Sequence, residues 1–199
     1  MVMDLPVDDG NATFEDYADA VLASYPTDVE DAVLVGHSLG SMVIPLVAAS
    51  RPALLLVFLC GVIPNVHGMP WNDAPPMGRP EAYQTETSDD GSSVFRSLES
   101  ARLSFYANCD PQDAGWAFEQ LRPQNSRSLW DRPYPLTELP ETPRAAIAGV
   151  DDVAITIEFS RAVTSPRLGV DLIEIAGAHS PFLARPGELA SLLDELVRS

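Results

Sequence analysis

The apolar positions of this chain fall into two recurring patterns, one with the period of a strand and one with the period of a helix. Short apolar runs, typical of strands in a parallel sheet, occupy residues 31–35, 54–60, 144–149 and 170–175. Apolar residues at helical spacing occupy residues 14–25, 41–50, 155–164 and 186–197. Strands that alternate with helices in this way predict an α/β fold with a mostly parallel sheet flanked by helices.

Local signals set the bounds of several elements. Thr13 is an expected N-cap, with Asp16 three residues later as its capping partner, and Pro26 ends the first helix. Pro45 lies inside the second helix and is expected to kink it. The first two strands are expected to be buried, whereas the last alternates apolar and acidic residues and should lie nearer the edge of the sheet.

The segment 65–142 differs from the rest of the chain because it is rich in proline, glycine, serine and acidic residues. Helical spacing persists at residues 99–107 and 111–121, whereas residues 69–91 have the composition of a mobile loop. We interpret the segment as a helical cap inserted into a single domain, whose core comprises residues 1–64 and 143–199.

Composition narrows the class of protein. The chain has 199 residues, 46% of them hydrophobic, which suffices for one domain with its own core. Its formal charge of −17, with no lysine, disfavours nucleic acids and anionic membranes as partners. No apolar run is long enough for a membrane span and the N-terminus lacks a signal-peptide pattern, so we expect a cytoplasmic protein. Cys60 and Cys109 do not imply a disulfide framework.

The strongest chemical signal is the pentapeptide Gly36-His37-Ser38-Leu39-Gly40, which lies between a predicted strand and a predicted helix. In a Gly-x-Ser-x-Gly turn the glycines allow a sharp bend, and the serine projects above the carboxyl end of the sheet as a nucleophile. The backbone N–H of Leu39 would then point at the developing oxyanion. His37 is expected to point away from the serine hydroxyl and to pack.

A serine nucleophile needs a base and an acid that orients the base. His179 follows the last predicted strand and precedes the final helix, which suits the base. Asp151 and Asp152 both follow the preceding strand and suit the acid; we favour Asp152, because it lies one residue deeper into the turn. The order serine, aspartate, histidine is the one that this architecture uses.

These residues resemble the α/β-hydrolase superfamily, and more narrowly the small bacterial hydrolases related to plant methylesterases and hydroxynitrile lyases. The matching stretches span nearly the whole chain and comprise Asp4-Leu5-Pro6, residues 16–21, 33–41 and 56–60, Trp116-Ala117, Leu121-Arg122-Pro123 and residues 179–183. Residues 69–91 match least well. The resemblance implies an α/β-hydrolase fold with a cap.

The resemblance also implies an earlier strand ending in a His-Gly motif, whose loop supplies a second oxyanion N–H. This sequence begins after that point, so we expect a sheet that lacks its first strands and their His-Gly loop. Residues 1–5 would then be an open edge of the sheet, where the chain could pair with itself as a homodimer.

The hydroxynitrile lyases of this group carry a lysine beside the catalytic histidine, where this chain has Ser180. That difference favours a carboxylic-ester hydrolase acting through Ser38, His179 and Asp152 and an acyl-enzyme. The alternatives are a lyase or carbon–carbon hydrolase on the same triad, or a truncated, inactive relative. The expected partner is a small-molecule ester, with no cofactor and no metal. The candidate pocket residues are Met69, Trp71, Phe105, Tyr106 and Trp116.

Overall fold

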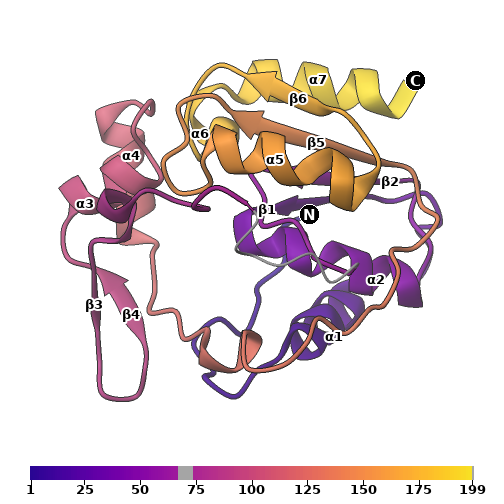
Figure 1. Cartoon of the computed structure of the whole chain (residues 1–199), viewed down its shortest axis with the longest axis horizontal. Coiled ribbons are helices and arrows are strands. Elements are labelled where there is room, and N and C mark those ends of the chain that lie inside the picture. The colour runs from indigo at the N-terminus through magenta and orange to yellow at the C-terminus, as the bar shows by residue number, and fades with distance from the viewer. Residues whose placement is uncertain (67–73, 199) are drawn as a thin grey trace.

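A four-stranded parallel sheet forms the centre of the computed structural model, which describes residues 1–66 and 74–198 (Figure 1). The strands lie in the order β1 (Val33–His37), β2 (Leu55–Leu59), β5 (Arg144–Gly149) and β6 (Leu172–Ile175). Each strand coincides with one of the four predicted runs to within two residues. The α/β class and the parallel sheet predicted from the alternating patterns are confirmed.

The register brings the carboxyl ends of the strands together at one edge of the sheet. His37 at the end of β1 pairs with Leu59 of β2, and Gly149 at the end of β5 pairs with Ile175 of β6. The loops that leave these ends carry the elbow serine, both candidate aspartates and His179. The topology therefore gathers residues from three distant parts of the chain, as parallel α/β sheets generally do.

Helices cover both faces of the sheet (Figure 1). The core cluster on one face joins Leu56 and Phe58 of β2 to α1 (Phe14–Ser24), α2 (Ile44–Ser50) and α5 (Ile157–Leu168). On the other face the intervening residues of β2 pack against α7 (Pro186–Arg198). Successive strand residues point to opposite faces, so an unbroken apolar run is what a strand buried on both faces requires.

Helix α1 begins as the sequence predicts, because Thr13 and Asp16 form a reciprocal capping box. The expected kinked helix over residues 41–50 is wrong. A short 3-10 helix, η1 (Ser38–Met42), precedes α2, and Pro45 lies in the first turn of α2. A proline is tolerated there because first-turn N–H groups have no partner within the helix.

Two expectations about the sheet edges need correction. Strand β1 is not buried on both sides: it lies at one edge of the described sheet, and Val35 is 42% exposed. Residues 1–5 form no strand; Arg122 contacts this segment through Asp4 Oδ1 at 2.5 Å and the Leu5 carbonyl at 2.6 Å. Strand β6 lies at the other edge, as predicted. The homodimer stays a prediction.

The segment between β2 and β5 contains the two expected helices, α3 (Leu98–Ser104) and α4 (Pro111–Glu119), beside α6 (Pro181–Ala184). Its described part also contains elements that the predicted loop over residues 69–91 did not include. They are the 3-10 helix η3 (Pro80–Tyr83) and an antiparallel hairpin of β3 (Thr85–Thr87) and β4 (Ser93–Phe95). A further 3-10 turn, η4 (Arg127–Leu129), precedes β5.

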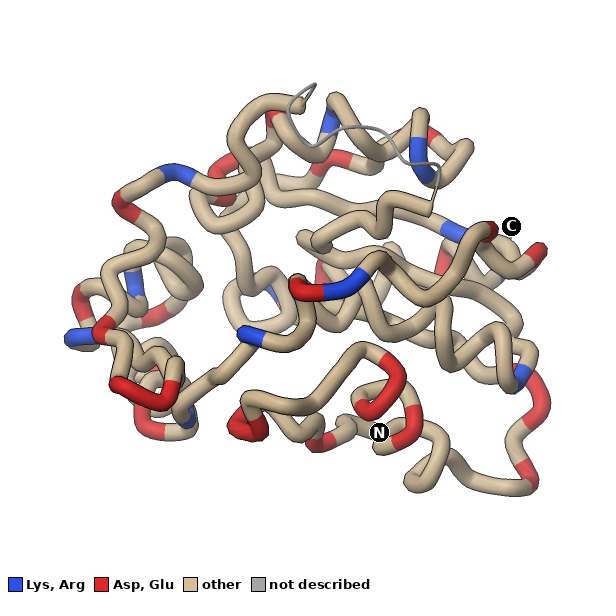
Figure 2. Tube along the Cα trace, turned by 60° about the horizontal axis from the view of Figure 1, so that its bottom comes forward, with Lys and Arg blue, Asp and Glu red and all other residues tan. Residues whose placement is uncertain are grey.

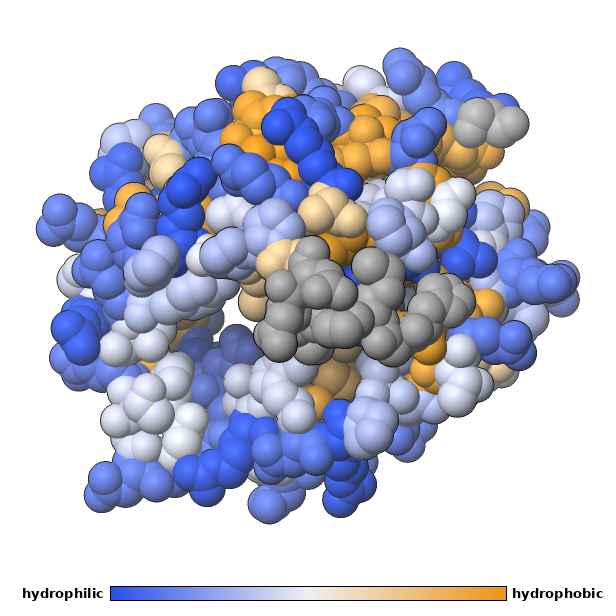
Figure 3. Space-filling model, viewed as in Figure 1, coloured by the Kyte–Doolittle hydropathy of each residue, from blue (hydrophilic) through white to orange (hydrophobic). Residues whose placement is uncertain are grey.

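Acidic positions are spread along the whole chain and are not confined to one segment (Figure 2). In the space-filling view an opening lies between the hairpin side of the molecule and the core (Figure 3). Among the described residues, no helix combines the length and apolar character needed to cross a bilayer.

Candidate active site

The elbow at the end of β1 holds Ser38 in a backbone conformation that few residues adopt, with φ at +52°. Such strain is concentrated at functional sites, where the surrounding structure enforces it. A Cβ at Gly36 would lie 2.6 Å from the Gly40 carbonyl oxygen, so position 36 has to be glycine. A Cβ at Gly40 would meet no atom within 4 Å. The steric role expected of both glycines therefore applies to Gly36 alone.

The elbow is held by a hydrogen bond of its own and by the loop after β2. Ser41 Oγ donates a hydrogen bond to the Gly36 carbonyl at 2.7 Å, and the Val62 N–H donates to the Ser38 carbonyl at 3.1 Å. A side chain at Gly61 would collide with Ser41 Oγ, so glycine allows this close approach. These contacts hold the turn from both of its ends.

His179 and Asp152 form a buried pair at the same edge of the sheet. His179 Nδ1 lies 2.7 Å from Asp152 Oδ2, and His179 is fully buried. The other carboxylate oxygen, Oδ1, accepts the backbone N–H groups of Ala154 and Ile155 at 2.8 and 2.9 Å. These bonds fix the carboxylate plane. Asp151 is exposed, so the geometry places Asp152, not Asp151, beside the histidine.

The Nε2 atom of His179 is buried and has no hydrogen-bond partner among the described residues. No hydrogen bond joins it to Ser38 in this conformation, although catalytic hydrogen bonds are often long without substrate and shorten in the complex. The loops that carry the two residues are nevertheless in contact, because the His37 and His179 ring centroids lie 4.6 Å apart.

His37 packs as the sequence predicts. Its Nε2–H donates to the His179 carbonyl at 2.8 Å, and Phe182 contacts its ring edge-on at 4.9 Å between centroids. Loss of solvent around the ring, together with a smaller contribution from His179, lowers the pKa of His37 to about 3. His37 is therefore neutral at ordinary pH and links the elbow to the histidine loop.

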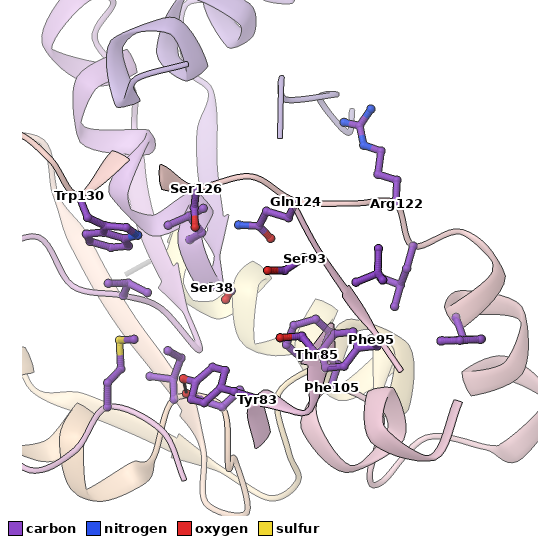
Figure 4. Close-up of a pocket in the computed structure, with 18 residues that line it drawn as sticks. Ser38, Tyr83, Thr85, Ser93, Phe95, Phe105, Arg122, Gln124, Ser126 and Trp130 are labelled. Atoms are coloured by element: carbon purple, nitrogen blue, oxygen red, sulfur yellow. Dashed lines mark hydrogen bonds between the residues drawn. The ribbon is translucent and has the colours of Figure 1, made fainter. Parts of the chain in front are cut away.

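A cavity of about 460 Å³ opens above the elbow, with Ser38 and Leu39 among its lining residues (Figure 4). Most of the lining is apolar, as in most small-molecule sites. Phe105 lines the cavity and also stacks on the His179 ring, with centroids 5.0 Å apart and planes 25° apart. Its ring thus lies against both the cavity and the histidine.

The five candidate pocket residues have different positions. Phe105 lines the cavity, but Tyr106 packs inside the α3–α4 cluster and Trp116 is 60% exposed on α4, outside the lining. Tyr106 follows the end of α3, and Trp116 lies on the solvent-exposed side of α4. Met69 and Trp71 lie outside the described residues.

Sequence reasoning missed the part of the lining contributed by η3, the hairpin and the segment after α4. These residues include Tyr83, Thr85, Ser93, Phe95, Gln124 and Trp130 (Figure 4). One available signal was Asp90-Gly91, a typical hairpin turn, where Gly91 adopts a φ of +91°.

Cys60, directly after β2, is fully buried and adopts a φ of +44°. Burial, together with a smaller contribution from the neighbouring Asp152, raises the pKa of its thiol to about 12, so it remains protonated and is no nucleophile. Cys60 and Cys109 are both free thiols. No cluster of three His, Cys, Asp or Glu side chains in the described part of the chain could hold a metal ion.

The strand–elbow–helix turn, the buried Asp–His pair and the cavity above them define a protein of the α/β-hydrolase class. The comparison with protein families agrees, since residues 3–192 match the model of the alpha/beta hydrolase family. The chain belongs to this family. No curated protein sequence matches it significantly.

Solved structures share the fold. A pyrethroid hydrolase from Sphingobium faniae is 23% identical to this chain, with a TM-score of 0.75. The match covers 94% of this chain and 79% of the pyrethroid hydrolase. Polyneuridine aldehyde esterase is 22% identical, with a TM-score of 0.75, and the match covers 94% of this chain and 80% of the esterase. A methylesterase from Arabidopsis is 20% identical, with a TM-score of 0.66, and the match covers 96% of this chain and 80% of the methylesterase. These likenesses establish the α/β-hydrolase fold.

Proposed function

We propose that this chain is a serine hydrolase that cleaves carboxylic esters through Ser38, His179 and Asp152. The observation that carries the proposal is the buried His179–Asp152 pair, joined at 2.7 Å, with Nε2 of the histidine left without a partner. A buried nitrogen of this kind is costly unless it has a functional partner. Ser38, which lines the adjoining cavity, carries the hydroxyl that would be this partner during catalysis.

In the proposed reaction, Ser38 Oγ attacks the ester carbonyl carbon while His179 Nε2 accepts the hydroxyl proton. The Leu39 N–H stabilises the oxyanion, and Asp152 stabilises the imidazolium. Collapse of the intermediate breaks the ester C–O bond, and His179 returns the proton to the departing alcohol. Water then attacks the acyl-enzyme by the same route and releases the acid.

The names of the similar structures support ester cleavage, since they describe a hydrolase, an esterase and a methylesterase. The cavity supports it as well, because its mostly apolar lining suits the body of an uncharged ester. The chemistry requires only side chains and a backbone N–H, so the proposal includes no cofactor.

A fluorophosphonate probe tests the nucleophile. We expect one covalent adduct by intact mass, its loss in Ser38→Ala, and its retention in Ser50→Ala, which alters an exposed serine at the end of α2. Hydrolysis of p-nitrophenyl esters should disappear with the adduct. An adduct that persists in Ser38→Ala would refute the role of Ser38, and turnover of cyanohydrins or β-diketones in preference to esters would refute the reaction type.

A further inference from the structure

One wall of the cavity is a small antiparallel sheet. Strands β3 and β4 pair Thr85 with Phe95 and Thr87 with Ser93. Gln124 extends this pairing, because its N–H and carbonyl exchange hydrogen bonds of 3.0 and 2.8 Å with the backbone of Ser93. Directly opposed residues of antiparallel strands place their side chains on the same face. The side chains of Ser93, Gln124 and Phe95 therefore share one face, and Thr85 lies beside them.

This face is turned toward the reacting serine. Thr85, Ser93, Phe95 and Gln124 all line the cavity that also contains Ser38. In Figure 4 the side chains of Ser93 and Gln124 lie next to each other, across the cavity from Tyr83. The Gln124 backbone is fixed by its two bonds to Ser93, so its side chain is presented from a rigid support.

The polar groups on this wall are all uncharged. Hydroxyl and amide groups can both donate and accept hydrogen bonds. Among the described residues that line the cavity, Arg122 is the single charged one, and its guanidinium is bound to Asp4 and to the Leu5 carbonyl. The wall therefore suits a neutral hydrogen-bonding group better than a carboxylate or an ammonium group.

We propose that Thr85, Ser93 and Gln124 form a hydrogen-bonding subsite that selects esters carrying a second, uncharged polar group remote from the scissile bond, with Gln124 as the specificity-determining residue. The class comprises neutral esters with an apolar body and a hydroxyl, ketone or amide at the far end. The aromatic side chains of Phe95, Phe105 and Trp130 supply apolar surface for that body. The proposal takes the ester from the proposed function, but its binding test does not depend on turnover.

Three methyl esters test the subsite: methyl 3-phenylpropanoate, its 4-hydroxyphenyl analogue and its 4-carboxyphenyl analogue. Binding is measured by calorimetry on Ser38→Ala, which cannot turn them over by the proposed route. We expect the hydroxylated ester to bind about fivefold more tightly than the plain ester, the gain of one net hydrogen bond. The carboxylate ester should bind more weakly than the hydroxylated one.

The double variant Ser38→Ala/Gln124→Leu should lose the preference for the hydroxylated ester and keep its affinity for the plain one. Ser38→Ala/Gln120→Leu is the matched control, because Gln120 is exposed at the end of α4 and outside the cavity lining. Far-ultraviolet circular dichroism and thermal melting check that each variant folds. Persistence of the preference in Ser38→Ala/Gln124→Leu would overturn the role of Gln124.

The two proposals fail in different ways. Equal binding of the plain and hydroxylated esters to Ser38→Ala overturns the subsite, whether or not the unsubstituted protein hydrolyses them. Discrimination in binding without hydrolysis by the unsubstituted protein overturns the proposed function and supports the subsite.

Discussion

Two regions border the active site: the edge of the core sheet that carries Ser38, Asp152 and His179 (the core edge), and the cavity wall that carries Thr85, Ser93 and Gln124 (the cap wall). They position their polar side chains by opposite means. At the core edge, burial and backbone sterics fix Asp152, His179 and Ser38, and the serine occupies a strained conformation. On the cap wall, Ser93 and Gln124 reach the cavity from ordinary antiparallel pairing. Substitutions at the core edge should therefore change rate and folding, whereas those at the cap wall should change substrate affinity.

The largest effect should come from the acid. Asp152→Asn presents an amide to His179 Nδ1, which favours the wrong histidine tautomer, so we expect kcat for a p-nitrophenyl ester to fall by about 10⁴-fold. Asp151→Asn is the control, because Asp151 is exposed, and its kcat should stay within about twofold. A larger loss in Asp151→Asn than in Asp152→Asn would reverse the assignment of the acid.

The two glycines of the elbow provide the next contrast. Gly36→Ala forces a Cβ against the Gly40 carbonyl at 2.6 Å and the Ser41 Cα at 2.8 Å, both parts of the backbone. We expect its free energy of unfolding to fall by about 3 kcal/mol, at the upper end of overpacking costs. Gly40→Ala meets no atom within 4 Å and should change stability by less than about 1 kcal/mol. Urea unfolding measures both, and equal midpoints for the two variants would contradict the steric argument.

The same contrast explains what the sequence could predict. Unbroken apolar runs and the Gly-x-Ser-x-Gly spacing report constraints that act over a few residues, and β1, β2 and the elbow were predicted to within two residues. The choice of Asp152 over Asp151 rested on turn position, and the structure joins Asp152 to His179. Local sequence patterns are therefore enough to predict an element where burial dictates which residue types can occupy it.

The residues of the cap wall could not be predicted from local patterns, because a single bridge between segments 31 residues apart places Gln124 next to Ser93. The prediction of Trp116 and Tyr106 as pocket residues rests on their aromatic character, but aromatic character does not say which side of a chain segment meets a cavity. The edge position of β1 was likewise missed, since an unbroken apolar run does not report how many neighbours a strand has.

The link between the elbow and the histidine loop should be visible in the pH dependence of stability. His37 has a pKa of about 3 when folded and 6.5 as its ordinary value, so the unfolded chain binds more protons between these limits. The free energy of unfolding should therefore fall as pH decreases from 6.5 toward 3. His37→Gln removes this titration, so we expect a shallower decline. Denaturant unfolding at several pH values measures it, and parallel curves for the two proteins would contradict the shifted pKa.

The smallest effect separates two exposed tryptophans. Trp130 is 46% exposed, but it lines the cavity and packs edge-on against Phe14. Trp116 is 60% exposed on α4 and lies outside the cavity lining. Trp130→Ala should raise KM about fivefold, which corresponds to about 1 kcal/mol, the lower end of what a small loss of apolar contact costs, with kcat nearly unchanged. Trp116→Ala should leave both constants unchanged. The two side chains are chemically identical and both largely exposed, so each variant is a control for the other. A rise in KM for Trp116→Ala and not for Trp130→Ala would show that the substrate binds to a different surface from the cavity above Ser38.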